Sequence, residues 1–265
     1  MTLPDTPFLS DLNASVQALY RLAPSHVPRT LVVCHCPVCM SHDTLAQIVA
    51  SPVRDLHPEL IRQYSNSAHG DPTDPDDLNA LLPRYLDLIA QDIEVDWNSV
   101  GADLKRFGDA RGTLAGFPAP GMAEELDRYA RLLLLHFGAL QATGADAVET
   151  PWMLLEILLI GGWPFAGLAA ALDELFELPD IGRPALVAFL ADIGGSFRDG
   201  RIELWALSRY RTEVAADLAA WLNRLLASDA FTDILTDPAL PERAALWVPA
   251  LAGLRGQFSA GMFGG

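Results

Sequence analysis

A chain of 265 residues with 51% hydrophobic and 20% charged side chains is long enough to bury a large core, and this composition excludes general disorder. The formal net charge of −16 disfavours a phosphate backbone or an anionic membrane surface, so we expect neither a nucleic acid nor a membrane as partner. The opening residues Met1 to Asp5 lack the charged and apolar regions of a signal peptide, which predicts a cytoplasmic protein.

Helical periodicity dominates the N-terminal part of the chain. Apolar residues at helical spacing over 9–20 predict a first helix, which Pro24 ends. The β-branched run over 30–33 predicts a short strand near Leu31 to Val33 or an extended approach to the cysteines that follow. Further helices are expected between the N-cap Ser41 and Pro52, and around 58–67.

The acidic segment 71–77 reads Asp-Pro-Thr-Asp-Pro-Asp-Asp and lacks the residue order of a calcium-binding EF-hand loop. Asp74 suits the N-cap of a helix, with Pro75 at its first position and two more acids in its first turn. The segment therefore predicts the start of a helix rather than a metal site. Pro83 is expected to interrupt or kink that helix, whose apolar positions continue to Ile89.

The second half of the chain begins after a stretch rich in Gly and Pro, 108–121, which is the best candidate linker. The helices predicted beyond it span 123–143, 151–160, 164–178, 184–193, 212–227 and 242–258. The apolar stretch 157–172 is broken by Gly161 to Pro164, so it predicts two buried helices that meet at a turn.

These patterns together predict an all-α fold, either an irregular helical bundle or a short α-superhelix of stacked helix pairs. The tripeptide Ile-Gly-Gly, at 160–162 and again at 193–195, favours stacked pairs. We expect a cysteine-bearing part, 1–110, and a helical part, 121–265, packed as one domain.

All three cysteines, Cys34, Cys36 and Cys39, lie within six positions. An odd, tightly clustered set is a poor disulfide framework and a better metal or redox candidate. As a zinc site, the three thiolates and the imidazole of His42 would form a tetrahedral Cys₃His set. His69 is an alternative fourth ligand, whereas His35 is less suitable because it lies between two cysteines.

A turn joining an extended segment to a helix is expected to bring Cys34, Cys36, Cys39 and His42 together on one side. Pro37 fixes its own φ and Ser41 caps the next helix, so few residues remain to reverse the chain.

Two other interpretations of the cysteines stay open. Cys36-Pro37-Val38-Cys39 is similar to the dithiol of thioredoxin-like oxidoreductases, in which Cys36 would attack a disulfide and Cys39 would resolve the mixed disulfide. Thr150-Pro151 suits the cis-proline of such proteins, but they need a surrounding sheet and this chain shows little strand pattern. Alternatively, the thiols pack as small hydrophobic groups in a turn.

Other candidate residues favour structural roles. His136, within the apolar run 132–137, is typical of a core histidine. Ser65, Ser67 and His69 suggest a nucleophile and a base, but the Gly-x-Ser-x-Gly pattern is absent from the sequence. The tryptophans in predicted helices are expected in the core or lining a groove: Trp152, Trp163, Trp205, Trp221 and Trp247. We therefore assign no catalytic residue.

Four ordered segments, 34–39, 52–56, 64–69 and 82–88, resemble a family of uncharacterised bacterial proteins. The last two of these segments read Tyr-Ser-Asn-Ser-Ala-His and Leu-Pro-Arg-Tyr-Leu-Asp-Leu. The resemblance covers about residues 31–90. This resemblance implies an all-helical fold with a cysteine-bearing N-terminal segment and no particular activity. It also weighs against the thioredoxin interpretation.

Within these segments Tyr64, Ser67 and Arg84 bracket the acidic loop. We expect them either to tie that loop to the cysteine turn or to recognise a ligand, and Arg84 can also pair with Asp87. The leading functional hypothesis is a non-enzymatic interaction protein whose acidic helical surface binds a basic protein partner. In this hypothesis the cysteine segment stabilises one end of the helical scaffold, and Zn is its candidate cofactor.

Overall fold

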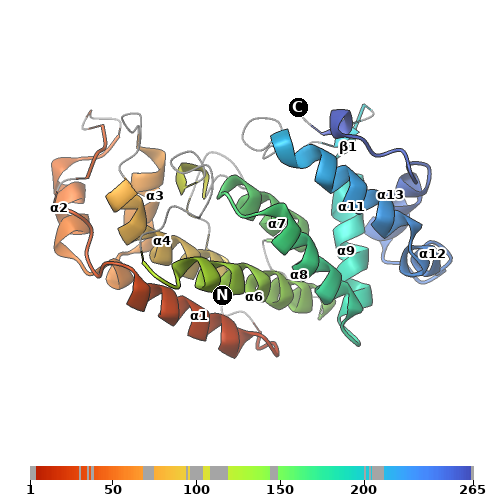
Figure 1. Ribbon diagram of the computed structural model, residues 1–265, viewed down its shortest axis with the longest axis horizontal. Coiled ribbons are helices and arrows are strands. Elements are labelled where there is room, and N and C mark those ends of the chain that lie inside the picture. Colours follow the sequence, from red (N-terminus) through yellow and green to blue (C-terminus); the bar gives the residue numbers. More distant parts are fainter. Residues whose placement is uncertain are drawn as a thin grey trace. The chain divides into compact units, whose positions relative to one another are not determined.

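The computed structural model describes residues 4–29, 31–34, 36, 39–67, 75–93, 95, 104–107, 119–143, 149–199, 201–202, 204 and 212–263. Its elements are almost all helical (Figure 1). The α-helices are α1 (Leu9–Leu22), α2 (His42–Ala50), α3 (Pro58–Asn66), α4 (Pro75–Ala90), α6 (Met122–Ala142), α7 (Pro151–Ile160), α8 (Phe165–Glu177), α9 (Gly182–Gly195), α11 (Ala215–Ala227), α12 (Asp229–Leu235) and α13 (Glu242–Ala252). Short 3₁₀ turns are η1 (Val53–Asp55), η3 (Thr212–Val214) and η4 (Ala260–Met262). The predicted all-α class is confirmed.

The small amount of strand lies elsewhere than predicted. In the described part of the chain, β1 (Phe197–Arg198) and β2 (Arg201–Ile202) form one antiparallel hairpin. Leu31 to Val33 form no strand, because the N–H of Val33 donates to the carbonyl of Leu31 at 3.1 Å and curls the chain. The N–H of Val32 donates to a side chain. The N–H groups of Val32 and Val33 are therefore both unavailable for hydrogen bonding to another strand.

The chain divides into two compact units. Unit 1 comprises Met1–Leu133 and Ile160–Trp163, and unit 2 comprises Leu134–Leu159 and Pro164–Gly265, so the division crosses helix α6. Most of the candidate linker, at 108–118, lies outside the described residues, as does the acidic stretch 71–74.

Unit 1 is built on helix α4, against which α1 and η1 pack. Pro83 lies inside α4 and does not interrupt it, because the helix continues to Ala90, and the alternative of a kink stays a prediction. The residues around Pro83 are buried, and their packing offsets the backbone hydrogen bond that proline lacks. The rings of Phe107 and Tyr85 are in edge-to-face contact at a centroid distance of 5.0 Å, which extends this core.

Unit 2 is centred on helix α9, which packs against α8 and α13. The ring of Phe189 lies 5.5 Å from that of Trp152 and 5.7 Å from that of Trp221 in edge-to-face contacts. A Cβ atom added to Gly194 would lie 2.8 Å from the Cβ of Trp247, so glycine at this position permits the close approach of α13.

The apolar stretch 157–172 is two helices, as predicted. Helix α7 ends at Ile160, the chain turns through Gly162 with φ of 94°, and α8 begins at Phe165. Gly194 and Gly195 instead lie within the last turn of α9, so the two Ile-Gly-Gly segments adopt different structures and do not support a repeat. Among the described residues, no helix combines the length and the apolar character that crossing a membrane requires.

Unit 2 differs from the prediction in the end of its last helix and in one additional short helix. The last predicted helix, 242–258, ends at Ala252, and a turn follows in which Gly256 has φ of 68°. Helix α12 was not predicted, because at seven residues it is too short for a periodic signal.

Candidate metal centre

The cysteine segment connects buried apolar residues to a capped helix. Leu31 and Val33 are buried before the cysteines, and Met40 is buried after them. Helix α2 then begins at His42, and the side chain of Ser41 accepts a hydrogen bond from the N–H of Thr44 at 3.0 Å. The predicted N-cap is confirmed, and packing on both sides holds the segment that carries the thiols.

The three cysteine side chains meet. The sulfur atoms of Cys34, Cys36 and Cys39 all lie within 4.8 Å of one another, and the Sγ atoms of Cys36 and Cys39 are 3.4 Å apart. The N–H of Cys39 donates to the carbonyl of Cys36 at 3.1 Å, which closes the turn. Cys36 is exposed and the other two are half-buried, so the group is open to ions from solvent.

Of the three histidine candidates, the structure describes His42. His42 is exposed at the first position of α2, and the group of converging ligand atoms comprises the three cysteines. The role of His42 as the fourth ligand therefore stays a prediction. His35 and His69 lie outside the described residues, as does Pro37, to which we attributed the turn.

An unpredicted contact anchors the cysteine segment to helix α4. The carboxylate of Asp77, which is 0% exposed, accepts the N–H of Val32 through Oδ2 at 2.9 Å. Asp77 lies in the first turn of α4, as predicted, and it also contacts a residue 45 positions earlier in the chain. On the other side of the cysteines, the hydroxyl of Thr44 donates to Oε1 of Gln63 at 3.1 Å and joins α2 to α3.

The spacing of the thiols suits a small, thiophilic ion. Zinc–thiolate bonds of about 2.3 Å in a tetrahedral site place their sulfur atoms about 3.8 Å apart. The Cys36–Cys39 pair is already at 3.4 Å, and a spread of 4.8 Å needs only a small closing movement of side chains on a surface turn. Three thiolates at this distance repel one another unless a cation neutralises them.

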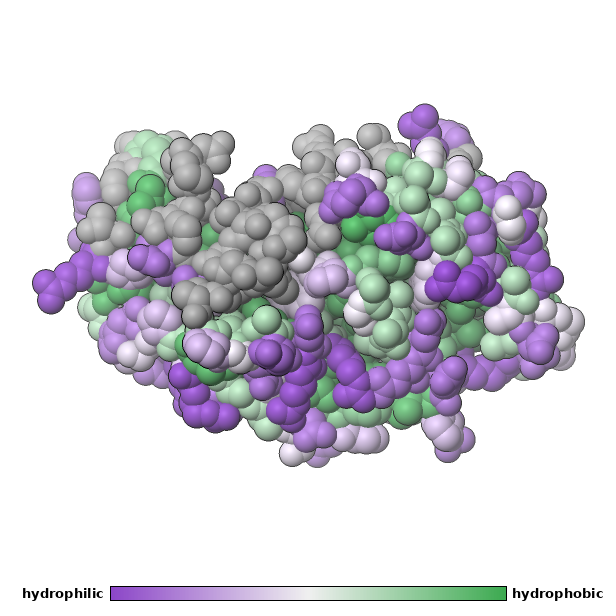
Figure 2. All heavy atoms as spheres, in the orientation of Figure 1, coloured by the Kyte–Doolittle hydropathy of each residue, from purple (hydrophilic) through white to green (hydrophobic). Residues whose placement is uncertain are grey.

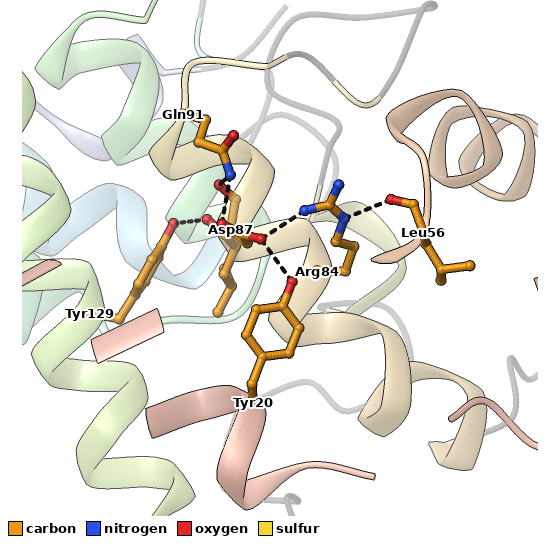
Figure 3. Close-up of polar contacts among 7 residues, drawn as sticks. Tyr20, Leu56, Arg84, Asp87, Gln91 and Tyr129 are labelled. Carbon is orange, nitrogen blue, oxygen red and sulfur yellow. Dashed lines mark hydrogen bonds and ion pairs between the residues drawn. The ribbon is translucent and has the colours of Figure 1, made fainter. Parts of the chain in front are cut away.

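A second polar cluster in unit 1 surrounds Asp87 (Figure 3). Its carboxylate accepts the hydroxyl of Tyr20 at 2.8 Å, Nη1 of Arg84 at 2.7 Å and Nε2 of Gln91 at 2.7 Å. Burial and the charge of Asp87 raise the pKa of the Tyr20 hydroxyl well above its usual range.

This cluster joins segments rather than forming a reaction centre. The Nε of Arg84 donates to the carbonyl of Leu56 at 2.9 Å, and the hydroxyl of buried Tyr129 donates to the carbonyl of Leu86 at 2.7 Å (Figure 3). Asp87 thus accepts bonds from three side chains, and these contacts together join α1, α4, α6 and the residue that follows η1. Arg84 pairs with Asp87, which was one of its predicted roles.

The other residues of the Tyr-Ser-Asn-Ser segment lie at the end of α3. Arg106 donates to the carbonyls of Ser65 and Ser67 and lies over the ring of Tyr64, 5.4 Å from its centroid. These bonds satisfy carbonyls that the helix end leaves unpaired. The acidic loop that Tyr64 and Ser67 were expected to hold lies outside the described residues from 68 to 74. No local sequence signal indicates the role of Arg106.

One histidine and three tryptophans are buried in the interior of the protein. His136 is 0% exposed, and burial lowers its pKa to about 4, which confirms the predicted core histidine. Trp152, Trp163 and Trp221 are buried as predicted, whereas Trp205 lies outside the described residues. The Nε1 of Trp163 donates to the carbonyl of Leu126 at 3.1 Å.

No protein-family model, curated protein or solved structure matches this chain. The fold also gives no support to the oxidoreductase alternative for Cys36 and Cys39. A thioredoxin-like dithiol needs a central sheet, and in the described ranges the strands are β1 and β2, of two residues each. The chemistry of the converging thiols is therefore the best guide to function.

Proposed function

We propose that this protein binds one zinc ion through Cys34, Cys36 and Cys39, with His42 as the fourth ligand, and that the metal stabilises a helical surface for a protein partner. The observation that carries the proposal is the convergence of three sulfur atoms within 4.8 Å. The residues between and beside the cysteines are too few to bury the thiols in a core of their own. A shared cation removes the cost of holding them together.

The metal would act on the fold through the anchors at each end of the segment. Asp77 holds Val32 just before the first ligand, and the capped start of α2 follows the last cysteine. An ion held between these points joins α4 and α2 through the cysteine segment. Binding free energy then becomes folding free energy, at about 2.7 kcal/mol for a free metal concentration one hundred times the dissociation constant.

The test is elemental analysis of protein purified without chelators. We expect about one zinc per chain, retained on dialysis, and loss of that zinc in Cys39→Ser with a lower melting temperature. Wild-type protein that carries no metal and takes none up from added zinc would refute the proposal, as would a triple Cys→Ser variant of unchanged stability.

The fourth ligand has its own matched pair of variants. His42→Asn should weaken zinc binding, whereas His26→Asn, which changes another exposed histidine of unit 1, should leave it unchanged. Three thiolates with an exchangeable water are the arrangement of an open zinc site, and four protein ligands are that of a closed structural site. Equal zinc affinity in both variants would leave a Cys₃ site and remove His42 from it.

The partner is proposed to be a protein with a basic surface, because the chain carries 34 acidic and 18 basic side chains. On the face drawn in Figure 2, hydrophilic side chains are interspersed among apolar ones. Such an interaction should weaken steeply with salt, and a partner recovered from cell extract should bind wild type more tightly than Cys39→Ser. A small-molecule turnover by the purified protein, with no partner recovered, would indicate an enzyme instead.

A further inference from the structure

A pocket of about 460 Å³ lies within unit 2, on residues that the metal centre does not use. Its walls are the end of α6, residues 183–191 of α9, and the segment 237–244 around the start of α13. The volume falls in the range of small-molecule sites, which are mostly apolar with a few polar groups that orient the ligand.

The floor of this pocket is apolar and built from small side chains. Val187, Ala191 and Ala244 line it and are buried, and the half-buried Ala188 lies on the same helix as the first two. Alanine at these positions leaves the hollow between α9 and α13 unfilled. An aliphatic group placed there would be removed from water, which is favourable in proportion to its apolar area.

Two arginines line the same pocket. Arg183 pairs with Asp237, and Nη2 of Arg243 lies 2.5 Å from Oδ1 of Asp192. Each arginine uses one terminal nitrogen in its ion pair, and a guanidinium group has five N–H donors. Their side chains are 48% and 65% exposed, so the remaining donors can turn toward a ligand. A planar guanidinium binds a carboxylate through two parallel hydrogen bonds.

The start of α13 adds to this preference for a negative charge. The helix begins at Glu242 after Pro241, without a side-chain cap, and Pro241, Arg243 and Ala244 line the pocket. Uncapped N–H groups and the helix dipole favour an anion there. The exposed carboxylate of Glu242 lies in the same turn, and Asp237 lines the pocket, so a single negative charge suits the site better than a double one.

We propose that this pocket binds a small amphipathic carboxylate, an aliphatic chain with one carboxylate head. The head group accepts hydrogen bonds from Arg183 and Arg243, and the chain lies on the apolar floor over Val187 and Ala191. An amine of the same shape would meet two guanidinium groups, and an alcohol would leave their donors less well satisfied.

Titration calorimetry with octanoate, octylamine and octanol on the full chain tests this proposal. We expect measurable octanoate binding, and at least tenfold weaker binding of the other two ligands. Arg183→Gln and Arg243→Gln should each weaken octanoate binding about tenfold, because each removes a charge-assisted hydrogen bond to the carboxylate. Arg224→Gln changes an exposed arginine of α11 away from the pocket lining and should leave the affinity unchanged.

Two further variants separate a binding role from a structural one. Asp237→Asn removes the carboxylate that pairs with Arg183 and competes with the ligand for it. This variant should therefore bind octanoate more tightly. Ala188→Trp fills the pocket and should abolish binding, with circular dichroism used to check the fold. No octanoate binding to wild type, equal binding of octylamine, or unchanged affinity in both Arg→Gln variants would overturn the proposal.

Discussion

The cysteine segment of unit 1 and the aromatic core of unit 2 are held by different forces. Around Phe189, large rings interlock, and Trp221 is 2% exposed while its Nε1 donates to Asp173 at 2.9 Å. Around the cysteines, a single carboxylate holds Val32 and a hydroxyl caps α2. Packed aromatic side chains form the interior of unit 2, whereas the cysteine segment combines the burial of Leu31, Val33 and Met40 with a few polar bonds and, in our proposal, a metal.

The largest expected loss of stability comes from removing a ring from the aromatic core of unit 2. Phe189→Ala should lower the free energy of unfolding by about 3–5 kcal/mol, because it removes a ring that contacts Trp152, Phe176 and Trp221 and leaves a cavity. Urea denaturation measures the change. Leu246→Ala, at a side chain that is 65% exposed in the same unit, should change stability by less than about 0.5 kcal/mol.

Acid should destabilise unit 2 through its buried histidine. The folded-state pKa of His136 is about 4, below the ordinary 6.5, so its contribution is fully present above pH 6.5 and is lost as the pH falls toward 4. The loss amounts to about 3 kcal/mol at pH 4. Between pH 7 and pH 4, the free energy of unfolding should fall by about 3 kcal/mol more in wild type than in His136→Leu. A constant difference between them would contradict this assignment.

Removing the hydrogen bond between Asp77 and Val32 should lower the free energy of unfolding by a smaller amount. The loss should be larger when zinc is bound. Asp77→Ala removes the acceptor of the Val32 N–H and should cost about 1–3 kcal/mol, and it should also weaken zinc binding. Asp77→Asn retains an acceptor oxygen and should restore most of the loss. Chemical denaturation with and without zinc measures both effects. Zinc affinity equal to that of wild type in Asp77→Ala would show that the anchor does not position the cysteines.

The smallest expected effect is in the Asp87 network. Tyr20→Phe removes one of three hydrogen bonds to Asp87 and should cost about 1–2 kcal/mol in urea denaturation. The raised pKa of Tyr20 favours the neutral phenol in the fold, so its contribution is present below about pH 10 and is lost at higher pH. A wild-type alkaline transition that is unchanged in Tyr20→Phe would assign that transition to another group.

Local signals in the sequence were enough for many elements. Helix α7 was predicted within its observed bounds, because Pro151 suits a first turn and Gly161 and Gly162 end the helix. The cap at Ser41 and the meeting of the three thiols were predicted for the same reason, since both depend on residues a few positions apart. The short helix α12 had only its Ser228 cap as a signal, with no periodic run long enough to support it.

Contacts between distant residues could not be derived in this way. Asp77 with Val32, Arg106 with the end of α3, and Arg243 with Asp192 join residues far apart in the chain. From the sequence alone, an acidic residue or an arginine that makes such a contact is interpreted as a surface charge or as a partner of the helix dipole. The pocket beside α9 was missed for the same reason, because alanines leave a hollow only when two helices pack against them.

The sequence by itself determined the helical class, most of the helix bounds and the cluster of thiols, because periodicity, caps and short spacings act within a few residues. The tertiary structure decided how the cysteine segment is anchored, where the Asp87 network lies, and that a pocket opens between α9 and the start of α13. These features depend on which helix faces pack together, and that choice is set by the burial of the whole chain.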